Sequence, residues 1–263
     1  MTDNTITDFL CTTILYFSER KGEHNGVSLL DLLKTSKYAI NKRNKANGID
    51  LLADINSGTV ATAFFDPQYR GILDKLSYGN EGESRGKARC ELTQMDDNTI
   101  KQFIREINRV LKNSGYLFLW VDKFHLCAGL HKWFEDTSLN IVDLVVWDKC
   151  KIGMGYRTRR KCEYLVICQK PPIVARDWSD HSIPDVWSER TYKTHPHSKP
   201  VDLQKHLIGA TTKVGEYVLD PASGGYSVFD ACIELGIDFI GCDIEFDENC
   251  VNGNNYDFIS ELL

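Results

Sequence analysis

The sequence predicts an α/β fold in which helices flank a doubly wound, mostly parallel sheet. The first observation is a set of short apolar runs rich in β-branched and aromatic residues, such as residues 59–65 and 116–121, which are typical of buried strands. The second is helical spacing between these runs: over residues 98–112, apolar residues such as Ile100 and Ile104 fall on one face. Strands that alternate with helices in this way form a largely parallel sheet.

The other elements follow from the same signals. Residues 5–20 and 28–45 are expected to form two helices that a polar turn joins. Asp97 or Asn98 is expected to cap the helix over 98–112, and Pro200 suits the first turn of a later helix. Further strands are expected at residues 141–147, 162–168, 216–219 and 239–242, and further helices at 124–136, 200–211 and 227–235.

We expect two regions along the chain of 263 residues: a helical N-terminal extension, 1–46, and a main domain, 47–263. Within the main domain, residues 70–96 contain four glycines and no regular periodicity, so they predict a mobile loop that serves a function or is disordered. Pro171-Pro172 opens a second irregular segment, which runs to about residue 198.

Composition narrows the class of protein. No apolar run is long enough to span a bilayer and no signal-peptide pattern opens the chain, so we expect a cytoplasmic protein without a membrane partner. Nine cysteines are present without a Cys-x-x-Cys pair, and the histidines show no metal-ligand pattern, so no metal site is expected. The net charge of -6 argues against nucleic-acid binding, because nucleic-acid binding favours a basic surface.

Positive charge is concentrated between Lys149 and Lys161. Six basic residues lie there, and only Asp148 opposes them. Such a cluster can form a DNA-binding face on an acidic protein, and it can equally be a solvated loop. The sequence leaves these two interpretations open.

Asp66-Pro67-Gln68-Tyr69 follows the predicted strand at 59–65, where the carboxyl end of a parallel strand meets the ligand crevice. The carboxylate of Asp66 and the carbonyl of Pro67 could accept the two hydrogens of an amine. Proline would fix that carbonyl in direction, and Tyr69 could stack on a base that has left its helix. The simpler interpretation is a turn with a buried tyrosine.

A second motif, residues 218–227, leads from a strand through small residues into a helix, which suits the close approach of a ligand to backbone amides. It begins with Asp220 and Pro221 and contains Ala222 and Gly224. About 20 residues later, Asp243 ends another strand, as do acids that bind ribose hydroxyls. The pair indicates a nucleotide-like cofactor and does not distinguish a methyl donor from a dinucleotide.

The order of these motifs resembles that of the amino-methyltransferases of DNA, in the permuted subclass called β. There the catalytic motif comes first and the cofactor half last. Besides the motifs above, residues 147–165 resemble the family's middle landmark, and His195-Pro196 through Lys199-Pro200 resembles a motif whose lysine helps to hold the cofactor. The resemblance covers roughly residues 47–250.

The resemblance implies a Rossmann-like methyltransferase fold, S-adenosylmethionine as cofactor, and double-stranded DNA as substrate. It assigns catalysis to Asp66, Pro67 and Tyr69. It further implies site-specific methylation within a restriction-modification system, with a possible cognate restriction endonuclease and a possible homodimer. Cofactor binding falls to Lys199, Asp220, Pro221, Ala222, Gly224 and Asp243, and substrate binding to Gln68, Arg157, Arg159 and Arg160.

Asp rather than Ser at position 66 favours the N6 amine of adenine as the target. Residues 171–198 are expected to read the target through Arg176, Arg190, Trp178 and Trp187, or else to form a surface excursion that the two tryptophans pin. The alternative enzymes are a cytosine-N4 DNA methyltransferase and a methyltransferase for adenine in RNA.

Four positions depart from the family pattern. Gln68 replaces the second proline of the catalytic motif. In the cofactor loop, Ala222 replaces an aromatic residue, Gly225 stands for the serine, and Tyr226 replaces the last glycine. Tyr226 could pack beside the methyl donor or crowd it. Gln68 and Tyr226 motivate a third alternative, a degenerate subunit that binds DNA or a partner methyltransferase without catalysis.

Overall fold

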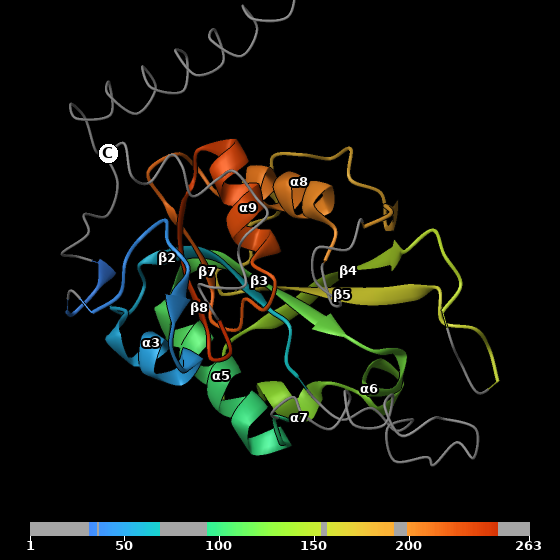
Figure 1. Ribbon diagram of the computed structural model, residues 1–263, viewed down its shortest axis with the longest axis horizontal. Coiled ribbons are helices and arrows are strands. Elements are labelled where there is room, and N and C mark those ends of the chain that lie inside the picture. Colours follow the sequence, from blue (N-terminus) through green and yellow to red (C-terminus); the bar gives the residue numbers. More distant parts are fainter. Residues whose placement is uncertain (1–31, 36, 69–93, 154–156, 192–198, 247–263) are drawn as a thin grey trace, which may run out of the picture.

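The computed structural model describes residues 32–35, 37–68, 94–153, 157–191 and 199–246, which form one mixed sheet between layers of helices (Figure 1). The sheet has eight strands in the order β1-β8-β7-β2-β3-β5-β4-β6, and β5 alone runs antiparallel to its described neighbours. The strands are β1 (Asn44–Lys45), β2 (Val60–Phe65), β3 (Leu111–Val121), β4 (Asn140–Asp148), β5 (Cys162–Gln169), β6 (Val186–Ser188), β7 (Tyr217–Asp220) and β8 (Asp238–Asp243).

Helices cover both faces of this sheet, as the alternation of elements predicts. Figure 1 shows α8 and α9 on one face and α3 and α5 on the other. The described helices are α3 (Gly48–Asp54), α5 (Asp97–Val110), α6 (Lys123–Ala128), α7 (His131–Phe134), α8 (Val201–Thr211), α9 (Ser227–Leu235) and the 3-10 turn η3 (Ala175–Asp177).

The strand β3 shows how the sequence builds the two cores. Its side chains alternate between the faces, because successive residues of a strand point in opposite directions. Leu117 and Leu119 pack in the core under α3 and α5, whereas Phe118 and Trp120 pack in the core under α8 and α9. A strand that is buried on both faces reads as a continuous apolar run, and this pattern made β3 predictable.

Two helix predictions are wrong. Residues 33–35 and 37–47 are not helical, and they include β1, which pairs with β8. The amide of Asn41 bonds the Asp238 side chain, and that of Asn44 bonds the Gly241 carbonyl, both at 2.9 Å, so these side chains compete with a helix for the backbone. The helix predicted over 124–136 is broken into α6 and α7 near Gly129, whose φ is 88°.

Asp96, rather than the predicted Asp97 or Asn98, caps α5 by accepting from the Thr99 N–H. Residues 5–20 and most of the predicted loop 70–96 lie outside the described residues. None of the described helices is long and apolar enough to cross a membrane.

Candidate functional site

Four aspartates gather at the carboxyl edge of the sheet. Asp66, Asp122, Asp220 and Asp243 follow or end β2, β3, β7 and β8, which run parallel, so their ends meet at one edge. The structure therefore brings the three predicted carboxylates together. Asp122 is an addition, and it is engaged already, because it caps α6 and accepts from the His125 ring at 2.8 Å.

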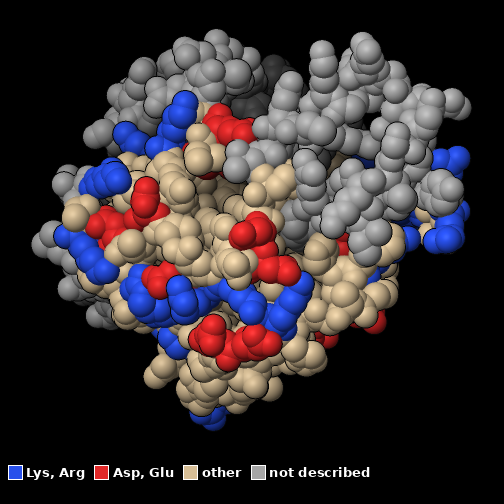
Figure 2. All heavy atoms as spheres, turned by 90° about the horizontal axis from the view of Figure 1, so that it is seen from below, with Lys and Arg blue, Asp and Glu red and all other residues tan. Residues whose placement is uncertain are grey.

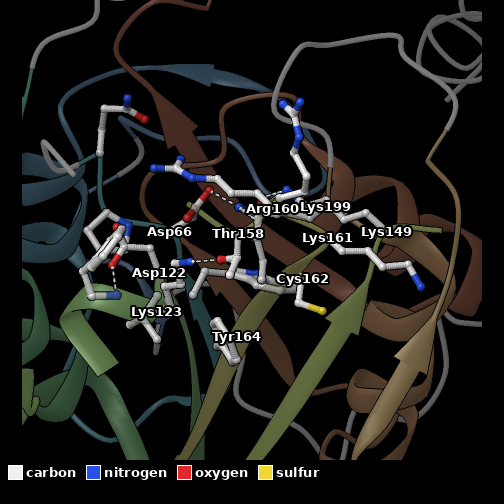
Figure 3. Close-up of a pocket in the computed structure, with 17 residues that line it drawn as sticks. Asp66, Asp122, Lys123, Lys149, Thr158, Arg160, Lys161, Cys162, Tyr164 and Lys199 are labelled. Atoms are coloured by element: carbon white, nitrogen blue, oxygen red, sulfur yellow. Dashed lines mark hydrogen bonds and ion pairs between the residues drawn. The ribbon is translucent and has the colours of Figure 1, made fainter. Parts of the chain in front are cut away.

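A cavity of about 330 Å³ opens beside Asp66 (Figure 3). This volume lies at the lower end of the range for small-ligand sites. β5 and the end of β4 form its far wall. The lining residues are Asp66, Pro67, Gln68, Trp120, Val121, Asp122, Lys123, Phe124, Lys149, Thr158, Arg159, Arg160, Lys161, Cys162, Glu163, Tyr164 and Lys199.

A chain of alternating charges runs along this cavity. The Lys199 ammonium lies 2.8 Å from Asp66 Oδ2 and 2.8 Å from Glu163 Oε2, and Lys149 lies 2.8 Å from Glu163 Oε1. The Trp120 ring lies 5.0 Å from Lys199 Nζ, which adds a cation–π contact. Figure 3 shows Lys199 and Asp66 pointing toward each other across the cavity.

The ion pairs keep Glu163 and Lys199 charged. Burial by itself would raise the pKa of Glu163, but the ammonium groups of Lys199 and Lys149 lower it to about 2. Burial would likewise lower the pKa of Lys199, but Asp66 and Glu163 raise it above its ordinary value. The cavity therefore holds an ionised lysine next to Asp66 and an ionised glutamate beyond that lysine.

Asp220 lies in a different environment. Its side chain is buried at the end of β7, and burial raises its pKa to about 8; Asp66 and Asp243 add to the rise, while the N–H of Ala222 opposes it. The carboxyl group accepts that N–H at 3.2 Å. A buried, protonated carboxyl group ionises readily only when a cation lies beside it.

The raised pKa of Asp220 predicts a dependence of stability on pH. Between its ordinary value of 3.8 and about 8, the folded protein retains a proton that the unfolded chain releases. This contribution to stability is complete below the lower value and is lost as pH rises through the higher one. The free energy of unfolding should fall by up to about 1.4 kcal/mol for each pH unit.

Urea unfolding of the protein without cofactor, at several pH values from 5 to 8, measures this effect. Asp220→Asn has no carboxyl group to titrate, so the difference in unfolding free energy between the two proteins isolates the contribution of Asp220. Two curves that remain parallel across the range would contradict the assignment.

The loop between β7 and α9 is closely packed. Gly224 has a φ of 49°, and its N–H donates to Asp243 Oδ2 at 2.9 Å. A Cβ on Gly48 would lie 2.1 Å from the Pro221 carbonyl, so only glycine lets the start of α3 approach the loop this closely. Sequence reasoning missed Gly48, because nothing local marks it.

Tyr226 is buried behind this loop. Its side chain is 2% exposed and packs with the core under α8 and α9. Its hydroxyl donates to the carbonyl of Asn44 at 2.8 Å, so it ties the loop to β1. The structure places the ring in the core, and whether it packs beside a bound methyl donor or crowds it stays a prediction.

The predicted substrate residues are only partly brought together. Gln68, Arg159 and Arg160 line the cavity, whereas Arg157 is exposed and outside the lining. Tyr69 lies outside the described residues, as do residues 195–198 of the lysine motif. The cofactor half contributes Lys199 alone to the lining; Asp220, Pro221, Ala222, Gly224 and Asp243 lie around the neighbouring loop.

Sequence reasoning did not single out Glu163, Lys149 or Trp120 as site residues. Glu163 and Lys149 belong to the middle landmark, so a signal existed, but sequence alone does not place them against Lys199. Trp120 belongs to an apolar strand and reads as an ordinary core residue.

The segment that was expected to read the target is packed against the sheet in its described part, up to residue 191. Trp178 makes edge contacts with Tyr116 and Phe118, and the Trp187 ring lies 5.1 Å from that of His206. Both tryptophans are partly buried, which fits the pinned excursion rather than rings free to wedge between bases. Arg176 and Arg190 are exposed, so their role as readers stays a prediction.

Charge on the surface is mixed. Figure 2 shows basic and acidic side chains interspersed over the described part of one face. Within the basic segment, Lys161 pairs with Asp148 at 2.5 Å, while Arg157, Arg159 and Arg160 are exposed. In the part of the chain that the structure describes, no cluster of His, Cys, Asp and Glu could hold a metal ion.

Known proteins are similar to this chain in sequence and fold. A family model described as DNA methylase matches residues 60–249. The Type II methyltransferase M.HhaII of Haemophilus parahaemolyticus is 60% identical over 215 residues, which cover 80% of this chain and 94% of the relative. The Type II methyltransferase M2.MboI of Moraxella bovis is 22% identical over 247 residues, 83% of this chain and 88% of the relative.

Two solved structures illustrate the likeness of fold. The complex of M1.HpyAVI with SAM has a TM-score of 0.55 at 17% identity and covers 78% of this chain and 94% of its own. The PvuII DNA methyltransferase, described as cytosine-N4-specific, has a TM-score of 0.60 at 12% identity, with coverage of 84% and 90%. The predicted Rossmann-like fold is confirmed.

Proposed function

This chain belongs to the family of DNA methylases, and on that premise we propose that it methylates the N6 amine of a flipped adenine in double-stranded DNA. The predicted cofactor is the one that the family uses, S-adenosylmethionine. The observation that carries the proposal is the position of Asp66: it directly follows β2, lines the cavity and pairs there with Lys199.

The loop beyond β7 fits the cofactor. The buried carboxyl group of Asp220 lies where an ammonium group would relieve its burial. Asp243 accepts from Gly224 and Glu245 N–H groups, one through each oxygen, which leaves lone pairs for ribose hydroxyls. When bound, the cofactor supplies a methyl group on a sulfonium, which is a strong electrophile.

The protein must make the adenine amine a nucleophile. Its lone pair conjugates into the ring, so the nitrogen must become pyramidal before it attacks. Asp66 accepts one hydrogen of the amine and the carbonyl of Pro67 accepts the other, which favours the pyramidal form. Gln68 lines the same cavity, and its carbonyl accepts from the Met95 N–H at 2.6 Å, so these two residues lie side by side.

Aspartate at position 66 supports adenine over cytosine, by the resemblance of the motif to its family. The degenerate-subunit alternative loses one of its two motives, since Tyr226 is buried away from the loop surface. Arg159, Arg160 and Lys161 at the cavity are suited to phosphate contacts, which position a protein on DNA without reading its sequence. The restriction-modification role extends the similarity to M.HhaII.

Three features of the proposal stay predictions. The partners are a cognate endonuclease and a homodimer, and the location is cytoplasmic. The regions are a separate N-terminal region over 1–46 and a target-reading segment over 171–198. β1 bears on the N-terminal region, because it adds Asn44 and Lys45 to the sheet.

Identification of the methylated nucleoside tests the proposed target. The protein is incubated with S-adenosylmethionine and DNA of mixed sequence, and with RNA in parallel, and the products are digested and separated. We expect N6-methyladenine from DNA alone. N4-methylcytosine, or methylated adenine from RNA, would establish the corresponding alternative, and no product together with no cofactor binding would favour the degenerate subunit.

A further inference from the structure

Glu163 lies beside Asp66 and has no part in the reaction as proposed above. It is the second residue of β5, opposite Trp147 of β4. Each of its carboxylate oxygens accepts from a different lysine, Lys149 and Lys199, at 2.8 Å. The side chain is 31% exposed and that of Lys199 only 14%, so the pair is held at the inner wall of the cavity.

Lys199 is shared between two carboxylates. Its ammonium lies equally close to Asp66 and to Glu163, at 2.8 Å each. Asp66, however, must accept a hydrogen of the amine with the same carboxylate that now accepts from Lys199. A hydrogen bond from an ammonium is roughly twice as strong as one from a neutral donor. An amine that approaches Oδ2 of Asp66 would therefore compete poorly if Lys199 had no other anion to bind.

We propose that Glu163 is a positioning residue that keeps Lys199 in place and charged while Asp66 turns to the amine. Lys149 and the Trp120 ring support the same arrangement, the first by fixing the other oxygen of Glu163 and the second by lying against the ammonium. The low pKa of Glu163, about 2, keeps it ionised at any working pH. This inference rests on the proposed function, because it concerns the acceptor of that reaction.

Glu163→Gln tests the proposal, because it keeps the shape of the side chain and removes its charge. Asp66 is then the one carboxylate that the described residues place beside Lys199. We expect kcat to fall by about 10- to 100-fold, the range that a misplacement of about 1 Å can cost, while KM for DNA stays unchanged. Glu163→Asp restores the charge on a shorter side chain and should recover part of the loss.

A double-mutant cycle separates this role from a merely structural one. If Glu163 acts through Lys199, then adding Glu163→Gln to Lys199→Met should cost less than about 2-fold more than Lys199→Met alone, since contacting residues that act together are not additive. The same cycle is measured on the binding of S-adenosylmethionine by calorimetry without DNA, which is independent of turnover. Additive losses in both measurements would overturn the proposal.

Glu135→Gln is the matched control. Glu135 also pairs with a lysine, Lys101 at 3.1 Å, but on the surface and outside the cavity. Its activity should equal that of the wild type. If Glu163→Gln fails to fold in a urea titration, the comparison rests on Glu163→Asp and the double variant. Wild-type protein inactive on all DNA would sink the proposed function, whereas an active wild type matched by Glu163→Gln would sink this inference alone.

Discussion

Asp66→Asn is expected to lower kcat for methyl transfer by about 10²- to 10³-fold, the usual cost of removing one preorganised group from a charge-stabilising site. The substitution keeps the size of the side chain but replaces one acceptor oxygen with a donor. The amine of adenine would then lose the acceptor that favours its pyramidal form. Transfer of a radiolabelled methyl group under single-turnover conditions measures this rate.

Binding should separate from catalysis in this variant. Asp66 lies in the cavity and not in the loop beyond β7, and Lys199 retains Glu163 as a partner. We therefore expect S-adenosylmethionine to bind Asp66→Asn as tightly as it binds the wild type. Asp202→Asn, at an exposed residue that pairs with Lys205 at 2.6 Å, is the control and should remain fully active. Wild-type rates in Asp66→Asn would refute the role assigned to Asp66.

Tyr226→Gly is expected to lower the free energy of unfolding by about 2–4 kcal/mol. Removing a buried aromatic side chain costs about 3–5 kcal/mol. The backbone at this position has a φ of 57° and a ψ of 30°, a region that glycine adopts freely, so the substitution recovers about 1 kcal/mol. Denaturation in urea, followed by circular dichroism, gives the difference between the two proteins.

Tyr226→Phe isolates the hydroxyl group. It removes only the hydrogen bond to the Asn44 carbonyl and should cost about 1 kcal/mol. Because the ring points into the core, neither variant should bind S-adenosylmethionine more tightly than the wild type while it remains folded. Tighter binding by Tyr226→Gly would show instead that the ring crowds the cofactor.

Much of the fold was predictable because its signals are local. The apolar runs of β2, β3 and β5 and the helical spacing of α5 are each contained in a short, continuous stretch of sequence. The wrong predictions share a cause that is not local. The segment that contains β1 carries no strand signal. Its Asn41 and Asn44 side-chain amides bond Asp238 and Gly241 of β8, which lie 197 positions away in sequence.

The candidate site divides in the same way. Asp66, Asp220 and Asp243 could be assigned to strand ends, in the order of a permuted methyltransferase, because both features depend only on positions along the chain. The place of Lys199 between Asp66 and Glu163, and the burial of Tyr226 in the core, could not be read from those positions. Contacts between charges and the direction of a ring depend on which strands become neighbours, and the pairing of strands distant in sequence is settled by packing of the whole sheet.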